Sequence, residues 1–158
     1  MIKTLSVVAA AFASIAIASP SLAQSFSPST GNVSGSGSVR LQQTTDVTCT
    51  VSITASPGAT SRAIPTRSIS AGSALCFVVT PYGAWKADVI PGSTTSVSLT
   101  IGANTVANKP CYGAVTVAWN NATNTATFNN NVLPAVNAGD PSCTIVSGSI
   151  RIPGLQIL

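Results

Sequence analysis

Apolar and polar residues alternate one by one along several stretches of the chain. Between residues 47 and 55 every second position is apolar: Val47, Cys49, Val51, Ile53 and Ala55. Side chains of a β-strand point alternately to its two faces, so a period of two is typical of a strand with one buried face. The pattern predicts a strand here, with Cys49 directed into the core.

The same alternation recurs further along, and the segments are separated by Pro, Gly and Asn residues typical of turns. It is clearest at residues 96–101 and 111–119. Shorter candidate strands lie at 74–80, 84–90, 103–108, 124–129 and 142–152. No helical period follows the first 23 residues. About eight to ten short strands predict an all-β domain, either a sandwich or a barrel, and we favour an antiparallel β-sandwich, Ig-like or jelly-roll-like.

The last of these strands changes faces along its length. Cys143 and Ile145 share one face, whereas Val146 and Ile150 share the other. A shift of one residue turns every following side chain to the opposite face of a sheet. We therefore expect a register change, such as a β-bulge, near Val146.

The segment that precedes residue 43 has a different character. After a turn-rich start, its alternating positions combine apolar residues with glycines: Val33, Gly35, Gly37, Val39 and Leu41. We interpret residues 24–42 as an extended N-terminal arm or first strand, and residues 43–158 as the sandwich domain. The glycines would let the arm lie against another backbone, either as a strand added to the open sheet edge of a neighbour or as the first strand of its own domain. The C-terminal Leu155, Ile157 and Leu158 also need a partner surface, at home or on a neighbour.

The first 23 residues predict a secretory signal peptide. Lys3 precedes an apolar stretch at 5–17, and Pro20 and small residues lead to a cleavage point after Ala23. The apolar stretch is shorter than the roughly 20 residues that span a bilayer, which disfavours a membrane anchor. We therefore expect a secreted protein of one domain, located outside the cell or on its outer surface.

The composition is poor in charge. Charged residues make up 6% of the chain, with seven Lys and Arg against three Asp, whereas about a quarter of a typical monomer surface is charged. The basic residues are scattered, so the net charge of +4 does not predict a nucleic-acid partner. A surface that repels its own copies so weakly favours assembly into a homopolymer or residence in a matrix.

Four cysteines follow the signal peptide: Cys49, Cys76, Cys111 and Cys143. An even number in an exported chain predicts two disulfides. Three pairings are open, and we favour the nested one, Cys49 with Cys143 and Cys76 with Cys111. A zinc site is disfavoured because the chain has no His and no closely spaced Cys pair.

Catalytic chemistry finds little support in the residue types present. The chain has no His and no Glu, and its three aspartates, Asp46, Asp88 and Asp140, are dispersed. A Ser or Thr nucleophile needs an adjacent base, and neither Lys86 nor Lys109 lies in a Ser-x-x-Lys arrangement. We therefore expect no enzyme, no catalytic residue, no metal and no cofactor.

Aromatic residues supply the candidate contacts. Trp85 and Trp119 share strand faces with apolar residues, which predicts packing in the core. Tyr82 stands between Pro and Gly in a turn, so we expect its ring to be exposed, where it could contact a polysaccharide or hydrocarbon surface. The Asn-rich residues 120–131 are typical of hairpin turns rather than of a binding site.

Several short motifs together resemble a known family. They are Asp46-Val-Thr-Cys49-Thr, Leu75-Cys76, Cys111-Tyr-Gly, Trp119-Asn-Asn-Ala-Thr and Pro141-Ser-Cys143-Thr. In these, the chain resembles the PraB-like "activator of alkane oxidation" proteins of Gram-negative bacteria. The resemblance implies a small exported protein linked to the cell surface, to biofilm or to hydrocarbon contact, and it implies no catalytic or ligand residue.

Two functions follow as expectations. The first is a structural or adhesive surface protein, a subunit of an extracellular filament or biofilm matrix that is assembled from copies of itself by donation of the N-terminal strand. The alternative is a surface-active or adhesive binding module that contacts hydrocarbon or polysaccharide through exposed rings and apolar ends.

Overall fold

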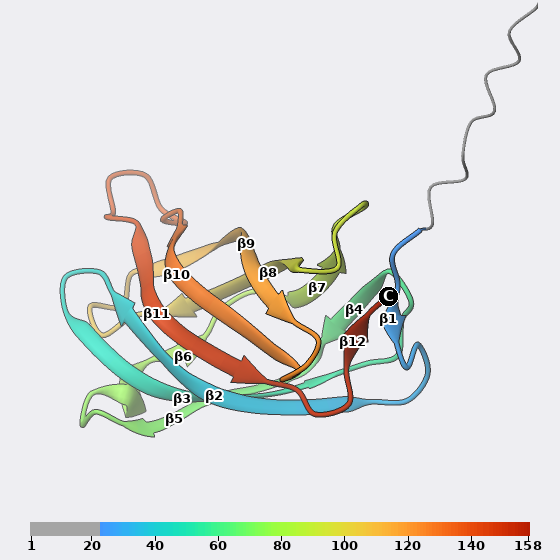
Figure 1. The fold of residues 1–158 in the computed structure, drawn as a ribbon. Coiled ribbons are helices and arrows are strands. Elements are labelled where there is room, and N and C mark those ends of the chain that lie inside the picture. Colours follow the sequence, from blue (N-terminus) through green and yellow to red (C-terminus); the bar gives the residue numbers. More distant parts are fainter. Residues whose placement is uncertain (1–22) are drawn as a thin grey trace, which may run out of the picture.

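The computed structural model describes residues 23–158, and strands account for almost all of its regular structure (Figure 1). The strands are β1 (Phe26–Ser27), β2 (Val33–Gln42), β3 (Asp46–Ala55), β4 (Ser61–Ile64), β5 (Thr66–Gly72), β6 (Thr80–Pro81), β7 (Trp85–Val89), β8 (Ser96–Asn104), β9 (Pro110–Asn120), β10 (Thr125–Leu133), β11 (Cys143–Arg151) and β12 (Gln156–Ile157). One short 3-10 helix, η1 (Cys76–Val78), interrupts them. The all-β class is confirmed. Within these residues, no helix is long and apolar enough to cross a membrane.

Ten strands form one antiparallel sheet. Its order is β4-β7-β8-β9-β10-β11-β2-β3-β5, with β6 paired to the end of β8, and β1 and β12 form a separate two-stranded sheet. Figure 1 shows the large sheet curling round on itself into a nearly closed, barrel-like arrangement. The inward faces of its strands therefore meet in one interior, rather than across two separate stacked sheets.

A seam remains where the two ends of the sheet meet. β4 and β5 are consecutive in the chain and joined through Pro65, yet β4 pairs with β7 and β5 pairs with β3. Arg67 of β5 crosses the gap, because its guanidinium donates hydrogen bonds to the carbonyls of Ile64 (3.0 Å) and Gly83 (2.6 Å) and lies 5.9 Å from the centre of the Trp85 ring. We call the gap between β5 and residues 80–84, which no strand pairing crosses, the seam.

The strands with clear alternation were predicted well. Those at 47–55, 96–101, 111–119 and 142–152 correspond to β3, β8, β9 and β11. The register change near Val146 is confirmed, because the pairing of β11 with β2 shifts between Ile145 and Ser147.

Two predicted strands are wrong, and β4 and β5 were missed, as were the two-residue strands β1 and β12. Most of 74–80 is η1 and a turn, and 103–108 is mainly the turn after β8. β4 escaped the pattern because its inward positions are Arg62 and Ile64, so that a fully buried arginine breaks the apolar period. In β5, Arg67 likewise shares the half-buried positions with Ile69.

The N-terminal segment lies in the middle of its own sheet. β2 pairs with β11 on one side and with β3 on the other along nearly its whole length. Its glycines do permit a close approach of two backbones, since a Cβ atom on Gly37 would stand 1.8 Å from the carbonyl oxygen of Ser149. The approached strand is β11 of the same chain. In this structure, residues 33–42 of the predicted arm 24–42 therefore form a strand within their own sheet.

The barrel-like sheet has one end that the chain termini close. We call this the closed end: Phe26, Leu155 and Ile157 are buried there, and Asn121 holds Ile157 through hydrogen bonds of 2.8 Å to both its N–H and its carbonyl. Arg62 is fully buried beside them, with its guanidinium 5.8 Å from the ring centre of Phe26. Of the C-terminal apolar residues, Leu155 and Ile157 thus pack against their own domain, whereas Leu158 stays 60% exposed. The Asn-rich turn supports this packing through Asn121. The predicted signal peptide lies outside the described residues, apart from Ala23.

Candidate functional site

Both disulfides lie at the opposite end of the sheet, which we call the disulfide end. They join Cys49 to Cys76 and Cys111 to Cys143. Two disulfides were predicted correctly, but the nested pairing is wrong.

The strand register explains the observed pairing. Cys49 of β3 lies opposite Gly72 of β5, four positions before Cys76. Cys111 pairs with Ala135 and Cys143 pairs with Leu133, so these two cysteines are brought to neighbouring places beside the end of β10. The Cys49 pairing depends on β5, which the sequence pattern did not reveal.

Gln43, in the turn between β2 and β3, ties three loops of this end together. Its side-chain amide donates to the carbonyl of Pro141 at 2.8 Å, and its side-chain oxygen accepts a hydrogen bond from the hydroxyl of Thr105 at 2.6 Å. An ion pair of 3.2 Å between Lys109 and Asp140 joins two of the same loops. The loops of the disulfide end therefore hold one another in place as well as being fixed by covalent bonds.

Large apolar side chains are exposed at this end. We call them the apolar rim: Leu75, Phe77, Val78, Tyr82, Val132 and Val136. They come from η1, from the turn after β6, and from the end of β10 with the loop that follows. Phe77 is 79% exposed, the largest value among them. In the described part of the chain, the other large apolar residue with a comparable exposure is Leu158.

The part of the rim on η1 stands on a clamped base. Cys76 and Val79 are almost completely buried, while the residues on either side of Cys76 point to solvent. The disulfide to Cys49 fixes the helix to β3, and the N–H of Ser73 donates to the carbonyl of Thr48 at 2.9 Å. Leu75 and Phe77 are therefore exposed because Cys76 between them is held inward.

Tyr82 lies in a turn, as the sequence predicted, and 36% of the residue is exposed. The ring meets Tyr112 edge-on at 6.2 Å between centres, and the Tyr112 hydroxyl donates to the carbonyl of Ala84 at 2.7 Å. Trp85 and Trp119 are buried, which confirms their prediction as core residues.

The exposed Phe77 was missed by sequence reasoning. Leu75, Cys76, Phe77 and Val78 form a continuous apolar run, which is also what a buried strand looks like. The signal that distinguishes the two is the disulfide partner of Cys76, which the sequence does not supply.

Charges at the disulfide end are matched. Arg40 forms an ion pair with Asp46 and holds the pKa of that carboxyl below its usual value by hydrogen bonding. Hydrogen bonds from Asn137 and Lys109 lower the pKa of Asp140. The third aspartate, Asp88, pairs with Lys86 on β7. Each carboxylate is thus neutralised by its own cation.

The candidate residues from the sequence analysis do not lie together in one chemical centre. The described residues contain no group of three or more His, Cys, Asp or Glu side chains placed to hold a metal ion. What the disulfide end offers instead is a rigid apolar surface with balanced charge.

A family model described as "Alkane oxidation protein activator PraA/PraB-like" matches residues 1–157. No curated protein matches the chain, and no solved structure does.

Proposed function

The chain belongs to the PraA/PraB-like family of alkane oxidation protein activators, and from this premise we propose that it is an exported protein that contacts hydrocarbon through the apolar rim. The single observation that carries the proposal is the exposure of the neighbouring apolar residues Leu75, Phe77 and Val78 on and beside η1, at the same end as the exposed Tyr82, Val132 and Val136. Scattered apolar residues are normal on protein surfaces, whereas grouped ones mark contact sites.

The rim would gain free energy by leaving water. Full burial of an aliphatic or aromatic side chain is worth roughly 1.5 to 3 kcal/mol, and Phe77 is still 79% exposed. The disulfide and the hydrogen bonds of Gln43 fix the loops beforehand, so contact would require little further ordering of the chain.

The charge pattern supports an apolar partner over a charged one. Transfer of an unpaired charge toward an apolar phase costs several kcal/mol, but Arg40, Asp46, Lys109 and Asp140 are already paired. Contact of the disulfide end with hydrocarbon therefore costs less free energy than it would if these charges were unpaired.

Filament assembly by donation of residues 26–42 is the less favoured proposal. β2 would have to leave its ladders with both β11 and β3, and a central strand is costly to remove. The low charge remains compatible with self-association, which would use a different surface.

The test uses the mature chain, residues 24–158, at a hexadecane–water interface. We expect the double variant Leu75→Ser, Phe77→Ser to lower the interfacial tension more slowly and to a smaller extent than the wild type. The matched control is Leu158→Ser, which removes an exposed leucine at the closed end and should behave as the wild type.

Equal behaviour of the double variant and the wild type would contradict the proposal. The proposal would also be contradicted if the wild type pelleted with insoluble polysaccharide but did not adsorb to hexadecane. Size-exclusion chromatography of all three proteins checks that a change in assembly does not cause the difference.

A further inference from the structure

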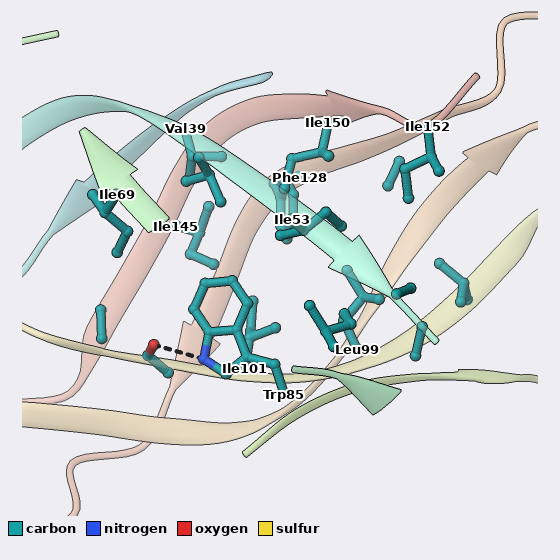
Figure 2. A pocket seen from close by; sticks show the side chains of 18 of the residues that line it. Val39, Ile53, Ile69, Trp85, Leu99, Ile101, Phe128, Ile145, Ile150 and Ile152 are labelled. Carbon is teal, nitrogen blue, oxygen red and sulfur yellow. Dashed lines mark hydrogen bonds between the residues drawn. The ribbon is translucent and has the colours of Figure 1, made fainter. Parts of the chain in front are cut away.

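A cavity of about 80 Å³ lies inside the curled sheet, and none of the rim residues lines it. Figure 2 shows side chains of opposite walls pointing into the same space, with Trp85, Leu99 and Ile101 on one side and Ile53, Phe128 and Ile150 on the other. Each of these side chains is buried. The cavity is thus an internal feature of the core, lined from several strands.

The cavity wall exposes almost only apolar side-chain atoms. The indole N–H of Trp85 is satisfied by the carbonyls of Gly102 and Tyr82, each at 3.0 Å. Arg62 also borders the cavity, but its terminal nitrogens donate to the carbonyls of Gly31, Ser56 and Pro28. Cavities of such composition stay dry, because a water molecule needs polar partners.

We propose that this cavity is a binding site for one small, uncharged apolar molecule. An empty apolar cavity has lost the dispersion contacts that a packed core makes, and an apolar ligand restores them. An apolar cavity of about 150 Å³ binds benzene or xenon. The present cavity has about half that volume, so it fits a xenon atom or a few carbon atoms and not a long alkyl chain.

Entry would use the seam. Ile69 of β5 and Trp85 of β7 both line the cavity and flank the gap, in which the sheet has no ladder of hydrogen bonds. Arg67 closes the gap by its bonds to Ile64 and Gly83. A ligand can therefore pass without breaking strand pairing, provided that Arg67 moves.

The experiment is a titration of the methyl-labelled mature protein with dissolved xenon and with propane, followed by NMR. We expect saturable shifts of the methyl resonances of Leu99, Ile101 and Ile145, which line the cavity. Linear shifts or none at these methyl groups would overturn the proposal.

Ethanol is the matched polar ligand, because it has the same number of heavy atoms as propane. Burial of its hydroxyl in an apolar site should weaken binding. Arg62 Nε is a buried donor without a partner, and a hydroxyl that reached it would gain a hydrogen bond. Tighter binding of ethanol than of propane would therefore overturn the apolar assignment.

Two variants change the cavity in opposite directions. Ala126→Val adds carbon atoms to the wall and should abolish the saturable shifts, whereas Phe128→Leu enlarges the space and should strengthen propane binding. If Ala126→Val does not fold, Phe128→Leu still decides the matter, and unchanged binding in it would contradict the site.

The interior site is independent of the proposed contact with hydrocarbon at the rim. Phe77 is not part of the cavity wall, so Phe77→Ser should bind propane as the wild type does. Loss of adsorption with intact propane binding would support both proposals, whereas unchanged adsorption with intact propane binding would support only the cavity.

Discussion

The two ends of the molecule differ in whether their apolar side chains are buried or exposed. At the closed end, the termini fold over the opening and bury Phe26, Leu155 and Ile157. At the disulfide end, Phe77 and its neighbours stay in water on a covalently fixed base. Apolar residues at the closed end are thus buried by the fold itself, whereas those of the apolar rim remain accessible for the contact that we propose.

The ends also differ in what holds them. Hydrogen bonds from Asn121 and Asn124 secure the C-terminal segment at the closed end. Disulfides secure the other end, where the exposed rim contributes little burial of its own. Substitutions at the two ends should therefore separate stability from surface activity.

Reduction of both disulfides should have the largest effect. The two closed loops, with sequence separations of 27 and 32 residues, do not overlap, so each contributes independently. The chain-entropy relation gives about 3 to 4 kcal/mol for each, and together they amount to a large share of the usual 5 to 15 kcal/mol of domain stability. Urea denaturation with and without reductant measures the loss. Peptide mapping that found Cys49 joined to Cys143 would contradict the pairing.

Ile157→Ala should be the next most damaging change. Ile157 is 1% exposed at the closed end, and such a substitution in a core costs about 2 to 5 kcal/mol. Its neighbour Leu158 is exposed, so Leu158→Ala should stay within about 0.5 kcal/mol. Equal effects in denaturation experiments would show that the C-terminal segment does not close the sheet.

Arg67→Met should weaken the seam. The variant loses the hydrogen bonds to Ile64 and Gly83, which we expect to lower the free energy of unfolding by about 1 to 3 kcal/mol. Arg151→Met, on the exposed side of β11, is the control and should change it by less than about 0.5 kcal/mol. Arg67→Met should also speed the exchange of propane between the cavity and solvent, measured at the interior methyl groups. A stable Arg67→Met protein with unchanged exchange would remove the seam as the entry path.

The pH dependence of stability should be small and confined to acid. Hydrogen bonds and ion pairs lower the folded-state pKa values of Asp46, Asp88 and Asp140. A lowered folded pKa adds stability that is present above the unfolded value of about 3.9 and is lost as the pH falls through the folded value. The chain has no His or Glu, so the urea midpoint should be flat between about pH 5 and 7. A marked slope in that range would contradict this assignment of the titrating groups.

Much of the fold could be predicted because most strands bury one face and expose the other. Alternation located β3, β8, β9 and β11, and the double set of apolar positions around Val146 located the bulge. β4 was hidden by Arg62, a charged residue in an inward position whose terminal nitrogens donate to backbone carbonyls. That satisfaction depends on segments distant in sequence, so no local pattern contains it.

The candidate site could be predicted only in part. Tyr82 followed from its place between Pro and Gly, but Phe77 did not, because its exposure depends on the bond from Cys76 to a strand 27 residues earlier. The prediction that the glycines of β2 allow another backbone to approach closely is correct. Which backbone it is depends on the whole sheet order.

Hydrogen exchange of the protein adsorbed on hexadecane droplets tests the contact at the disulfide end most directly. We predict that amides of residues 72–79 and 132–136 exchange more slowly on droplets than in solution, whereas those of residues 153–158 do not change. Protection of the closed end instead, or equal protection of both ends, would contradict the proposed role of the apolar rim.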